Sequence, residues 1–471
     1  MIQIIGGGLA GCEAAWQAAR QGEDVTLYEM RPVRGTLVHK TDHLAELVCS
    51  NSFRGDKLDN AVGLIKEEMR RLDSVVMAAA EVARVPAGAA LAVDREVFSR
   101  EVAARLASQP HITVCRDEIA SVPPPSAPGD AVIIATGPLT SDALSQSIQA
   151  FVGEEHLAFY DAISPIVLAE SIDMDRVFRQ SRWGRSLRRD TAGAGAGRVD
   201  AAPVAVAVES EAETGPACGV DDGAGDYLNC PFTKAEYEAF YDALVTAESA
   251  TIHDFDTATF FEGCLPIEVM AHRGKDTLRF GPMKPIGLED PRTGRRPYAA
   301  VQLRQDTLAG DHFSLVGFQT QLKWSEQSRV LRLVPGLERA QFVRFGMVHR
   351  NTFINGPKVL LPTWQTRVRP DLFFAGQISG VEGYVESAAS GLIAGRNAAL
   401  VARGLTPQAP PRTTAIGALA YYASHADPRH YQPSNITFGI MPPLDSPPRD
   451  KALRKQALAD RALADLAAWR P

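Results

Sequence analysis

Apolar residues open the chain as a short uninterrupted run, Ile2–Ile5, and glycines follow at positions 6, 7, 8 and 11. Small and apolar residues then continue at helical spacing to about Arg20, and Gly22 marks a stop. Residues 25–29, VTLYE, form a second apolar run that ends in Glu29. The pattern predicts a strand, a glycine-rich turn, a helix and a second strand, which together make one βαβ unit of a parallel sheet.

Two later stretches repeat the junction of an apolar strand with a glycine turn. Residues 131–137 read AVIIATG, and residues 371–387 read DLFFAGQISGVEGYVES, followed by a helix with small residues on one face. Short continuous apolar runs bounded by glycine are typical of buried parallel strands. Because these junctions lie far apart in the chain, we expect one α/β nucleotide-binding domain whose chain leaves and later returns.

The pattern therefore divides the chain into three parts. We expect residues 1–145 and 341–471, the latter with a C-terminal helix, to form the two parts of the nucleotide-binding domain. Residues 146–340 are expected to form an inserted α/β domain. Within this insertion, residues 184–225 are dominated by alanine, glycine and small polar residues and offer almost nothing to anchor a core. Such a composition predicts a disordered surface loop.

Composition narrows the class of protein. The chain has 471 residues, of which 45% are hydrophobic and 22% charged, as in ordinary globular proteins. No apolar run is long enough to span a bilayer and no signal sequence precedes the first strand, so we expect a cytoplasmic protein without membrane contact. The six cysteines lack metal-ligand spacing, so no metal site is expected. The oligomeric state stays open, a monomer included.

The net charge of −7 gives no support to nucleic-acid binding through total charge, although a local basic surface remains compatible with it. Candidates for such a surface are Lys284, Arg292, Arg295, Arg296, Lys323, Arg344, Arg350 and Lys358.

The first glycine turn has the spacing of a dinucleotide site. In Gly6-x-Gly8-x-x-Gly11, the first glycine permits a tight turn, the second lets the backbone approach a pyrophosphate, and the third lets helix and strand pack closely. Glu29 is placed to accept hydrogen bonds from a ribose. A glycine motif at this place, with two later glycine turns, resembles the glutathione-reductase-like FAD-binding Rossmann fold. The candidate cofactor-binding residues are Gly6, Gly7, Gly8, Leu9, Ala10, Gly11, Glu29, Gly137, Gly376, Gly380, Glu382 and Gly383.

Longer motifs carry a more specific resemblance. The stretches AELVCSNSFR, DYLNCPF, EGCLPIEVMAHRG, VGFQTQLKW and FFAGQISGVEGYVESAASGL resemble the folate- and FAD-dependent tRNA (uracil-5-)-methyltransferases. The likeness covers nearly the whole chain outside residues 184–225. It implies methylation of C5 of a T-loop uridine in tRNA, with 5,10-methylenetetrahydrofolate as the carbon donor. It also implies reduction through FAD from NADPH or NADH.

The resemblance assigns two candidate catalytic residues, Cys49 and Cys230. Uracil C5 is a poor nucleophile until a thiolate adds to C6, and the C5 proton must later be removed, so the reaction needs one nucleophile and one proton acceptor. Which cysteine takes which role stays open. The candidate folate-binding residues are His349, whose imidazole would stack on the pterin, and its neighbours Arg350 and Asn351.

Three other functions stay open. A related FAD protein that modifies the tRNA wobble uridine resembles this chain at the glycine turns, but it carries a larger helical C-terminal domain, and the CSNS and LNCP stretches argue against it. Some relatives act on ribosomal RNA instead of tRNA. A non-catalytic FAD- and RNA-binding scaffold would need another reason to keep both thiol motifs.

Overall fold

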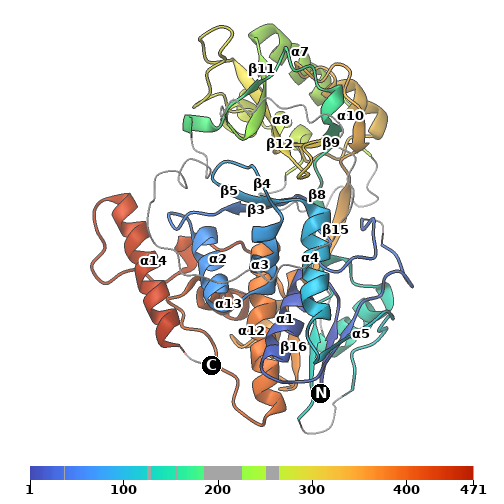
Figure 1. Cartoon of the computed structure of the whole chain (residues 1–471), viewed down its shortest axis with the longest axis vertical. Coiled ribbons are helices and arrows are strands. Elements are labelled where there is room, and N and C mark those ends of the chain that lie inside the picture. Colours follow the sequence, from blue (N-terminus) through green and yellow to red (C-terminus); the bar gives the residue numbers. More distant parts are fainter. Residues whose placement is uncertain (37, 125–128, 154–156, 185–224, 251–264, 470–471) are drawn as a thin grey trace, which may run out of the picture.

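The computed structural model describes residues 1–36, 38–124, 129–153, 157–184, 225–250 and 265–469, without the side chains of 157–162 and 348–350. Its described part forms a lower body built on a parallel sheet and an upper body built on an antiparallel sheet (Figure 1). Both chain ends lie in the lower body. The predicted loop at 184–225 falls, apart from its two end residues, outside the described residues.

Five parallel strands form the lower sheet. Their order is β16 (Leu372–Phe374), β7 (Ala131–Ile134), β1 (Ile2–Ile5), β2 (Val25–Tyr28) and β6 (Ile112–Cys115). Helix α1 (Leu9–Arg20) follows β1 after the glycine turn, so the predicted βαβ unit is confirmed. All four residues of β7 are buried, as continuous apolar runs predict for a central parallel strand. The α/β fold class is therefore as predicted.

Helix α12 (Tyr384–Ala402) packs against α1 through small residues. A Cβ atom on Gly391 would lie 2.1 Å from the carbonyl oxygen of Ala10, and one on Gly395 would lie 2.3 Å from that of Ala14. The two backbones therefore approach too closely for a side chain at either glycine. This contact fixes the start of α1 near the start of α12, whose first residue is Tyr384.

Six strands form the upper sheet. Their order is β10 (Phe178–Arg179), β11 (Tyr227–Phe232), β12 (Ala299–Gln305), β13 (His312–Leu315), β9 (Ile166–Leu168) and β14 (Phe342–Arg344). All neighbouring strands are antiparallel. One face packs against α7 (Lys234–Val245), α8 (Ile267–His272) and α10 (Trp324–Leu331) in a separate hydrophobic core.

A two-stranded ribbon, β8 (Leu157–Ala162) with β15 (Val348–Phe353), stands between the two bodies (Figure 1). The predicted domain boundary at residue 145 falls inside α5 (Asp142–Val152), ahead of the ribbon. The division into domains otherwise stays an interpretation.

The remaining elements complete the two bodies. In the lower body they are β5 (Ala90–Val93), β4 (Arg84–Val85), α2 (Ala61–Arg71), α3 (Val75–Val82), α4 (Arg95–Ala107), η1 (Gly137–Leu139), α11 (Gly356–Val359), η6 (Gln377–Ser379), α13 (Ala415–His425), η7 (Phe438–Ile440) and α14 (Lys451–Ala468). In the upper body they are η2 (Ala169–Ser171), η3 (Arg182–Gly184) and α9 (Thr277–Phe280). None of the described helices has the length and apolar character needed to cross a membrane.

An ion-pair cluster anchors β3 (Ser52–Gly55), the strand that follows the first candidate cysteine. Asp56, just past this strand, lies 3.2 Å from Nζ of Lys66 and 2.8 Å from a guanidinium nitrogen of both Arg70 and Arg84. Burial opposes ionisation of Asp56, but the three cations outweigh it and lower the pKa of this carboxyl to about 2. The cluster therefore holds the end of β3 through a carboxylate that stays charged.

Candidate active site

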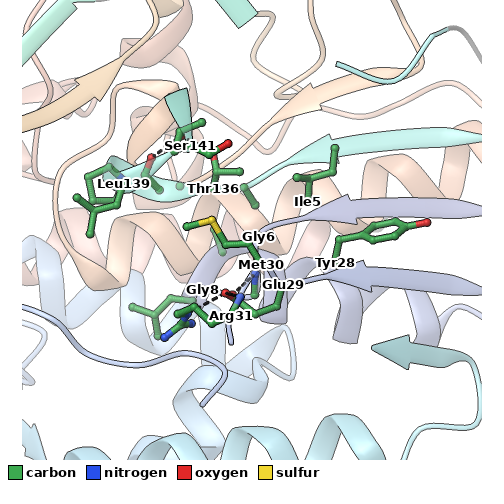
Figure 2. A pocket seen from close by; sticks show the side chains of 18 of the residues that line it. Ile5, Gly6, Gly8, Tyr28, Glu29, Met30, Arg31, Thr136, Leu139 and Ser141 are labelled. Carbon is green, nitrogen blue, oxygen red and sulfur yellow. Dashed lines mark hydrogen bonds and ion pairs between the residues drawn. The ribbon is translucent and has the colours of Figure 1, made fainter. Parts of the chain in front are cut away.

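A cavity open to solvent lies at the carboxyl ends of four strands of the lower sheet. This is the edge at which open α/β sheets bind their ligands. Figure 2 shows Thr136, Leu139 and Ser141 on one wall and Gly8, Glu29 and Arg31 on the opposite wall. The residues that follow each strand and line the cavity include Gly6, Gly7, Gly8, Leu9 and Ala10 after β1, Glu29, Met30 and Arg31 after β2, Thr136 to Ser141 after β7, and Gly376 and Gln377 after β16.

The glycine turn leaves an open cradle at the start of α1. Gly8 is the N-cap residue, no side chain caps the helix there, and a Cβ atom built on Gly8 would meet nothing within 4 Å. Gly11 has the opposite environment, because its Cβ would lie 1.8 Å from the carbonyl oxygen of Gly6. The first turn of α1 contains no acidic residue. A helix N-terminus exposed in this way favours a phosphate group, so the turn fits a dinucleotide pyrophosphate.

Glu29 is held in place at the end of β2. One carboxylate oxygen accepts the backbone N–H of Gly7 at 3.0 Å, and the other accepts Nε of Arg31 at 2.8 Å. Burial acts to raise the pKa of Glu29, but the hydrogen bonds and charge of Arg31 outweigh it and keep the pKa below its usual value. Arg31 is fixed in turn by Glu46, at 2.8 Å. The carboxylate is therefore ionised and oriented, as the acceptor of ribose hydroxyl groups requires.

The predicted cofactor residues separate into those that line the cavity and those behind it. Gly6, Gly7, Gly8, Leu9, Ala10, Glu29, Gly137 and Gly376 line it; Gly11, Gly380, Glu382 and Gly383 do not. Gly380 has a positive φ of 88° and packs against the ring of Tyr431, so that turn is required by close packing. Glu382 accepts a hydrogen bond from Gln377 at 2.6 Å, and Gln377 lines the cavity. Its carboxylate therefore supports the cavity wall from behind.

Asn351, a predicted folate residue, has an amide whose two polar atoms are buried without a hydrogen-bond partner in the structure. It lies on β15, and the backbone of the same strand reaches η6, where Ile354 N–H donates to the carbonyl of Ile378 at 2.9 Å. Buried amides without partners are rare and costly. Asn351 is fully buried and does not line the cavity, so its amide does not face the cavity in this structure. The side chains of His349 and Arg350 lie outside the described residues.

Cys49 follows Val48, which lines the same cavity, but it is not itself a lining residue. The hydroxyl oxygen of Tyr384 accepts the backbone N–H groups of Cys49 and Ser50 at 2.7 and 3.2 Å. Tyr384 and Val48 both line the cavity. The cysteine is partly exposed, which is compatible with access to its thiol, and its catalytic role stays a prediction. Burial raises the pKa of Tyr384, so the phenol stays neutral and keeps its position as an acceptor.

Three arginines surround the loop that carries Cys49. Nη1 of Arg95 donates to the carbonyl of Leu47 at 2.7 Å, and Nη2 of Arg344 donates to the carbonyl of Val48 at 2.6 Å. Arg304 comes from β12 of the upper body, and its side chain contacts the same loop. Each of the three interacts electrostatically with Cys49. The loop therefore lies in a positive environment, as a reactive thiolate requires.

Arg304 is buried, and its guanidinium group hydrogen bonds to side chains of the loop that carries Cys49. Its Nε donates to Oδ1 of Asn51 at 2.8 Å, and its Nη2 donates to Oγ of Ser50 at 3.1 Å. Among the described residues it has no carboxylate within ion-pair distance, and burial lowers its pKa. Its charge is therefore not neutralised by a direct partner. Sequence reasoning missed Arg304 and Tyr384 because both are brought to Cys49 by long-range packing.

Cys230 lies in a different environment from the one predicted. It is 0% exposed on β11 and packs in the core of the upper sheet with Leu228 and Phe232. Burial raises the pKa of Cys230 and keeps the thiol neutral. The prediction that both sulfur atoms meet at one accessible site is therefore wrong for this conformation. The role of Cys230 itself stays a prediction. Across the described ranges, no group of three or more possible ligands is placed to hold a metal ion.

Known proteins similar to this chain agree with its fold and its sequence motifs. The family model described as glucose inhibited division protein A matches residues 1–192 and 198–406. GidA of Aquifex aeolicus, in its form II crystal, aligns with a TM-score of 0.67 at 16% identity over 99% of this chain and 73% of that one. Such a likeness supports the glutathione-reductase-like fold.

Sequence relatives are much closer than this structure. The methylenetetrahydrofolate–tRNA-(uracil-5-)-methyltransferase TrmFO of Pelotomaculum thermopropionicum is 56% identical over 94% of this chain and 92% of that protein. The protein of the same name from Enterococcus faecalis is 52% identical, with the same coverage of both chains. Identity at this level extends through both bodies of the molecule. The chain therefore belongs to the TrmFO family of methylenetetrahydrofolate–tRNA-(uracil-5-)-methyltransferases.

Proposed function

We propose that this protein methylates C5 of a T-loop uridine in tRNA, with 5,10-methylenetetrahydrofolate as the carbon donor and FAD, reduced by NADPH or NADH, as the reductant. The observation that carries the proposal is the hydrogen bond of the Cys49 backbone to Tyr384, which lines the dinucleotide cavity together with Val48, the residue before Cys49. A thiol and a cofactor site must be neighbours for one nucleobase to reach both. The names of the relatives supply the substrate classes.

FAD would be held by residues at the carboxyl edge of the sheet. The N-terminus of α1 at Gly8 would receive the pyrophosphate, and Glu29 would accept the ribose hydroxyls. Gly137 and Gly376 leave the opposite side of the cavity free of side chains. When bound, FAD supplies the two electrons that convert a transferred methylene group into a methyl group.

Cys49 is the proposed nucleophile on the RNA. Its thiolate forms a bond to uracil C6, and the electron pair moves toward C5, which then attacks the one-carbon unit of the folate. Removal of the C5 proton would break the bond between the one-carbon unit and its carrier nitrogen, which leaves as the amine, and would leave an exocyclic methylene group at C5. Two electrons and a proton from the reductant would convert this group into methyl, and expulsion of the sulfur from C6 would restore the uracil ring. Arg95, Arg304 and Arg344 lie around the loop that carries Cys49 and would orient it toward the substrate.

Cys230 is the proposed second reactive group, on the family resemblance alone. In the conformation described above it lies within the upper core, so a direct role requires β11 to move toward the cavity. Asn351, with His349 and Arg350, is proposed to receive the folate. The amide of Asn351 has unpartnered donors and acceptors that suit a pterin edge, and contact with folate requires this buried side chain to become accessible.

A basic cleft on the upper body supports RNA binding. It is lined by Arg176, Arg292, Arg295 and Arg296. Arg176 and Arg292 are neutralised by neighbouring carboxylates, whereas Arg295 and Arg296 are exposed and have no ion-pair partner among the described residues. Two such guanidinium groups on one loop are suited to RNA phosphates despite the negative total charge.

The alternative functions have less support. The motif resemblance that argues against wobble-uridine modification covers nearly the whole chain, whereas the likeness to GidA of Aquifex aeolicus is 16% identical and supports the fold alone. A non-catalytic scaffold has no use for a partly exposed thiol among arginines, next to a residue that lines the cavity. Methylation of ribosomal RNA uses the same site chemistry, and the assay below separates it from the tRNA activity.

The test supplies methylene-labelled folate and NADPH to the purified holoenzyme with either unmodified tRNA or ribosomal RNA, followed by digestion to nucleosides. Label in 5-methyluridine is expected, and it should be absent with a T-loop lacking the target uridine. Label that comes instead from S-adenosylmethionine, or that enters ribosomal RNA alone, would overturn the assignment. Cys49→Ala and Cys230→Ala should each abolish transfer with FAD still bound; for Cys230, unchanged activity with lower stability would reduce its role to packing.

A further inference from the structure

Three aromatic side chains form a continuous stack at the edge of the upper body. The rings of Phe342 and Phe345 have centroids 5.1 Å apart and planes 24° from parallel. The rings of Phe345 and Trp324 are 5.9 Å apart and 17° from parallel. We call these three residues the aromatic ladder. Because the ring planes are nearly parallel at each step, the three rings stack face to face, as bases do in a nucleic-acid strand.

The ladder runs from the core to the surface. Phe342, on β14, packs against the hydrophobic core of the upper sheet. Trp324, the first residue of α10, is 61% exposed. Burying a tryptophan of this size would give a large hydrophobic gain, so an exposed one at the end of a supported stack is unusual. One ring face is covered by Phe345, and the exposure shows that much of the indole remains open.

The ladder adjoins the loop that carries the candidate nucleophile. Arg344 lies between Phe342 and Phe345 in sequence, and its guanidinium donates to the carbonyl of Val48, one residue before Cys49. On the other side, Trp324 follows Lys323, whose ammonium is exposed and paired with Glu248 at the surface. The ladder is therefore linked to the loop of the candidate nucleophile through Arg344, and its open end follows a surface lysine in sequence.

We propose that the aromatic ladder is a stacking platform for an unpaired nucleobase of the RNA substrate, with Trp324 as the residue that the base contacts. The inference rests on the proposed function, since it takes RNA as the substrate. A uridine that reaches Cys49 must leave the stack of its loop, and the base beside it then loses a stacking partner. The open face of Trp324 replaces that partner and so holds the loop open.

Ring orientation favours a nucleobase over an apolar protein surface. A protein partner gains most from a wide apolar patch, whereas here one flat face stands at the end of parallel rings with charged neighbours at Lys323 and Arg344. Aromatic faces beside cations are the usual composition of single-stranded RNA sites.

The experiment measures binding of a fluorescently labelled T-arm stem–loop to the FAD-loaded enzyme by anisotropy. Trp324→Ala should weaken binding by about 5- to 150-fold, the range for loss of one stacked base, and Trp324→Phe should restore most of the affinity. A fully paired duplex of the same stem should bind the wild type and Trp324→Ala equally, because it offers no unpaired base. The salt dependence of stem–loop binding should stay unchanged, since no phosphate contact is lost.

Phe280→Ala is the matched control, because Phe280 is 78% exposed on the same body. It should leave stem–loop binding unchanged. Equal affinity of the wild type and Trp324→Ala for the stem–loop would overturn the proposal, and so would an equal loss on the paired duplex. This binding result is independent of the test of the proposed function. The proposed function fails if the wild type forms no 5-methyluridine, whether or not Trp324→Ala weakens RNA binding.

Discussion

Replacing Gly8 with valine separates cofactor binding from folding at a single position. The backbone at Gly8 has φ −77° and ψ −171°, an extended conformation that any residue adopts, and a Cβ there meets no atom within 4 Å. The free energy of unfolding of the cofactor-free protein should therefore change by less than about 1 kcal/mol. The added methyl groups would instead occupy the space through which a pyrophosphate reaches the start of α1.

The expected loss follows from the hydrogen bonds that this approach permits. Hydrogen bonds between backbone N–H groups and a charged phosphate contribute about 1.5–3 kcal/mol each. If valine prevents two of them, FAD binding weakens by about 3–6 kcal/mol, which corresponds to roughly 10²- to 10⁴-fold in Kd. Purified Gly8→Val protein should then be colourless, while Gly8→Ala should retain part of the flavin because one methyl group is smaller.

Flavin absorbance per mole of protein and thermal unfolding of the cofactor-free form are the two measurements. Gly11→Ala is the control for a folding defect, because its Cβ would lie 1.8 Å from the carbonyl oxygen of Gly6 and must displace the backbone. That variant should lower the unfolding temperature even without FAD. If Gly8→Val bound FAD with unchanged affinity, the placement of the pyrophosphate at this turn would be refuted.

Three further predictions follow from charged groups. Arg304→Gln should slow alkylation of Cys49 at pH 7 by about tenfold, measured by mass spectrometry of the Cys49 peptide, and an unchanged rate would remove Arg304 from the site. The double variant Arg295→Gln, Arg296→Gln should reduce the slope of log K for tRNA binding against log salt concentration by about one unit per lost phosphate contact. Arg100→Gln on α4 should leave this slope unchanged. The lowered pKa of Asp56 stabilises the fold above pH 3.8, and this contribution is lost as the pH falls to about 2. The loss of unfolding free energy caused by Asp56→Asn, measured in denaturant, should therefore shrink by about 2 kcal/mol between pH 5 and pH 2. A loss that is the same at both pH values would contradict the role of the cluster.

The glycine turn could be predicted from the sequence because its determinants are local. Apolar residues 2–5, the glycine spacing and the position of Glu29 all lie within one βαβ unit, and each acts on its near neighbours. The order of the five parallel strands was not predicted, because it depends on pairing between segments more than 100 residues apart, such as β1 with β7. The predicted end of the first segment, residue 145, falls inside α5, and the division into domains stays a prediction.

The sequence around Cys230 contains a pattern that predicts its burial, but the resemblance of the motif to a reactive cysteine was given more weight. In YLNCPF, residues Leu228, Cys230 and Phe232 alternate with polar or small positions, and a strand places alternate residues on one face. That face packs into the upper core, as the structure shows. Pro231 keeps the segment extended, as predicted, but extension in a sheet buries the thiol instead of presenting it. The unpartnered amide of Asn351 had no comparable signal, because hydrogen-bond satisfaction depends on tertiary contacts.

The two faces of the β11–β12 pair connect the upper body to the reactive loop. Cys230 belongs to the apolar face, whereas Arg304 belongs to the polar face and hydrogen bonds to Ser50 and Asn51 beside Cys49. Movement of this strand pair toward the cavity, which a direct role of Cys230 requires, would break these buried hydrogen bonds at a cost of about 1–3 kcal/mol each. Any ligand that moves the upper sheet therefore also changes the charge around Cys49, so access of the second thiol and reactivity of the first are coupled through Arg304.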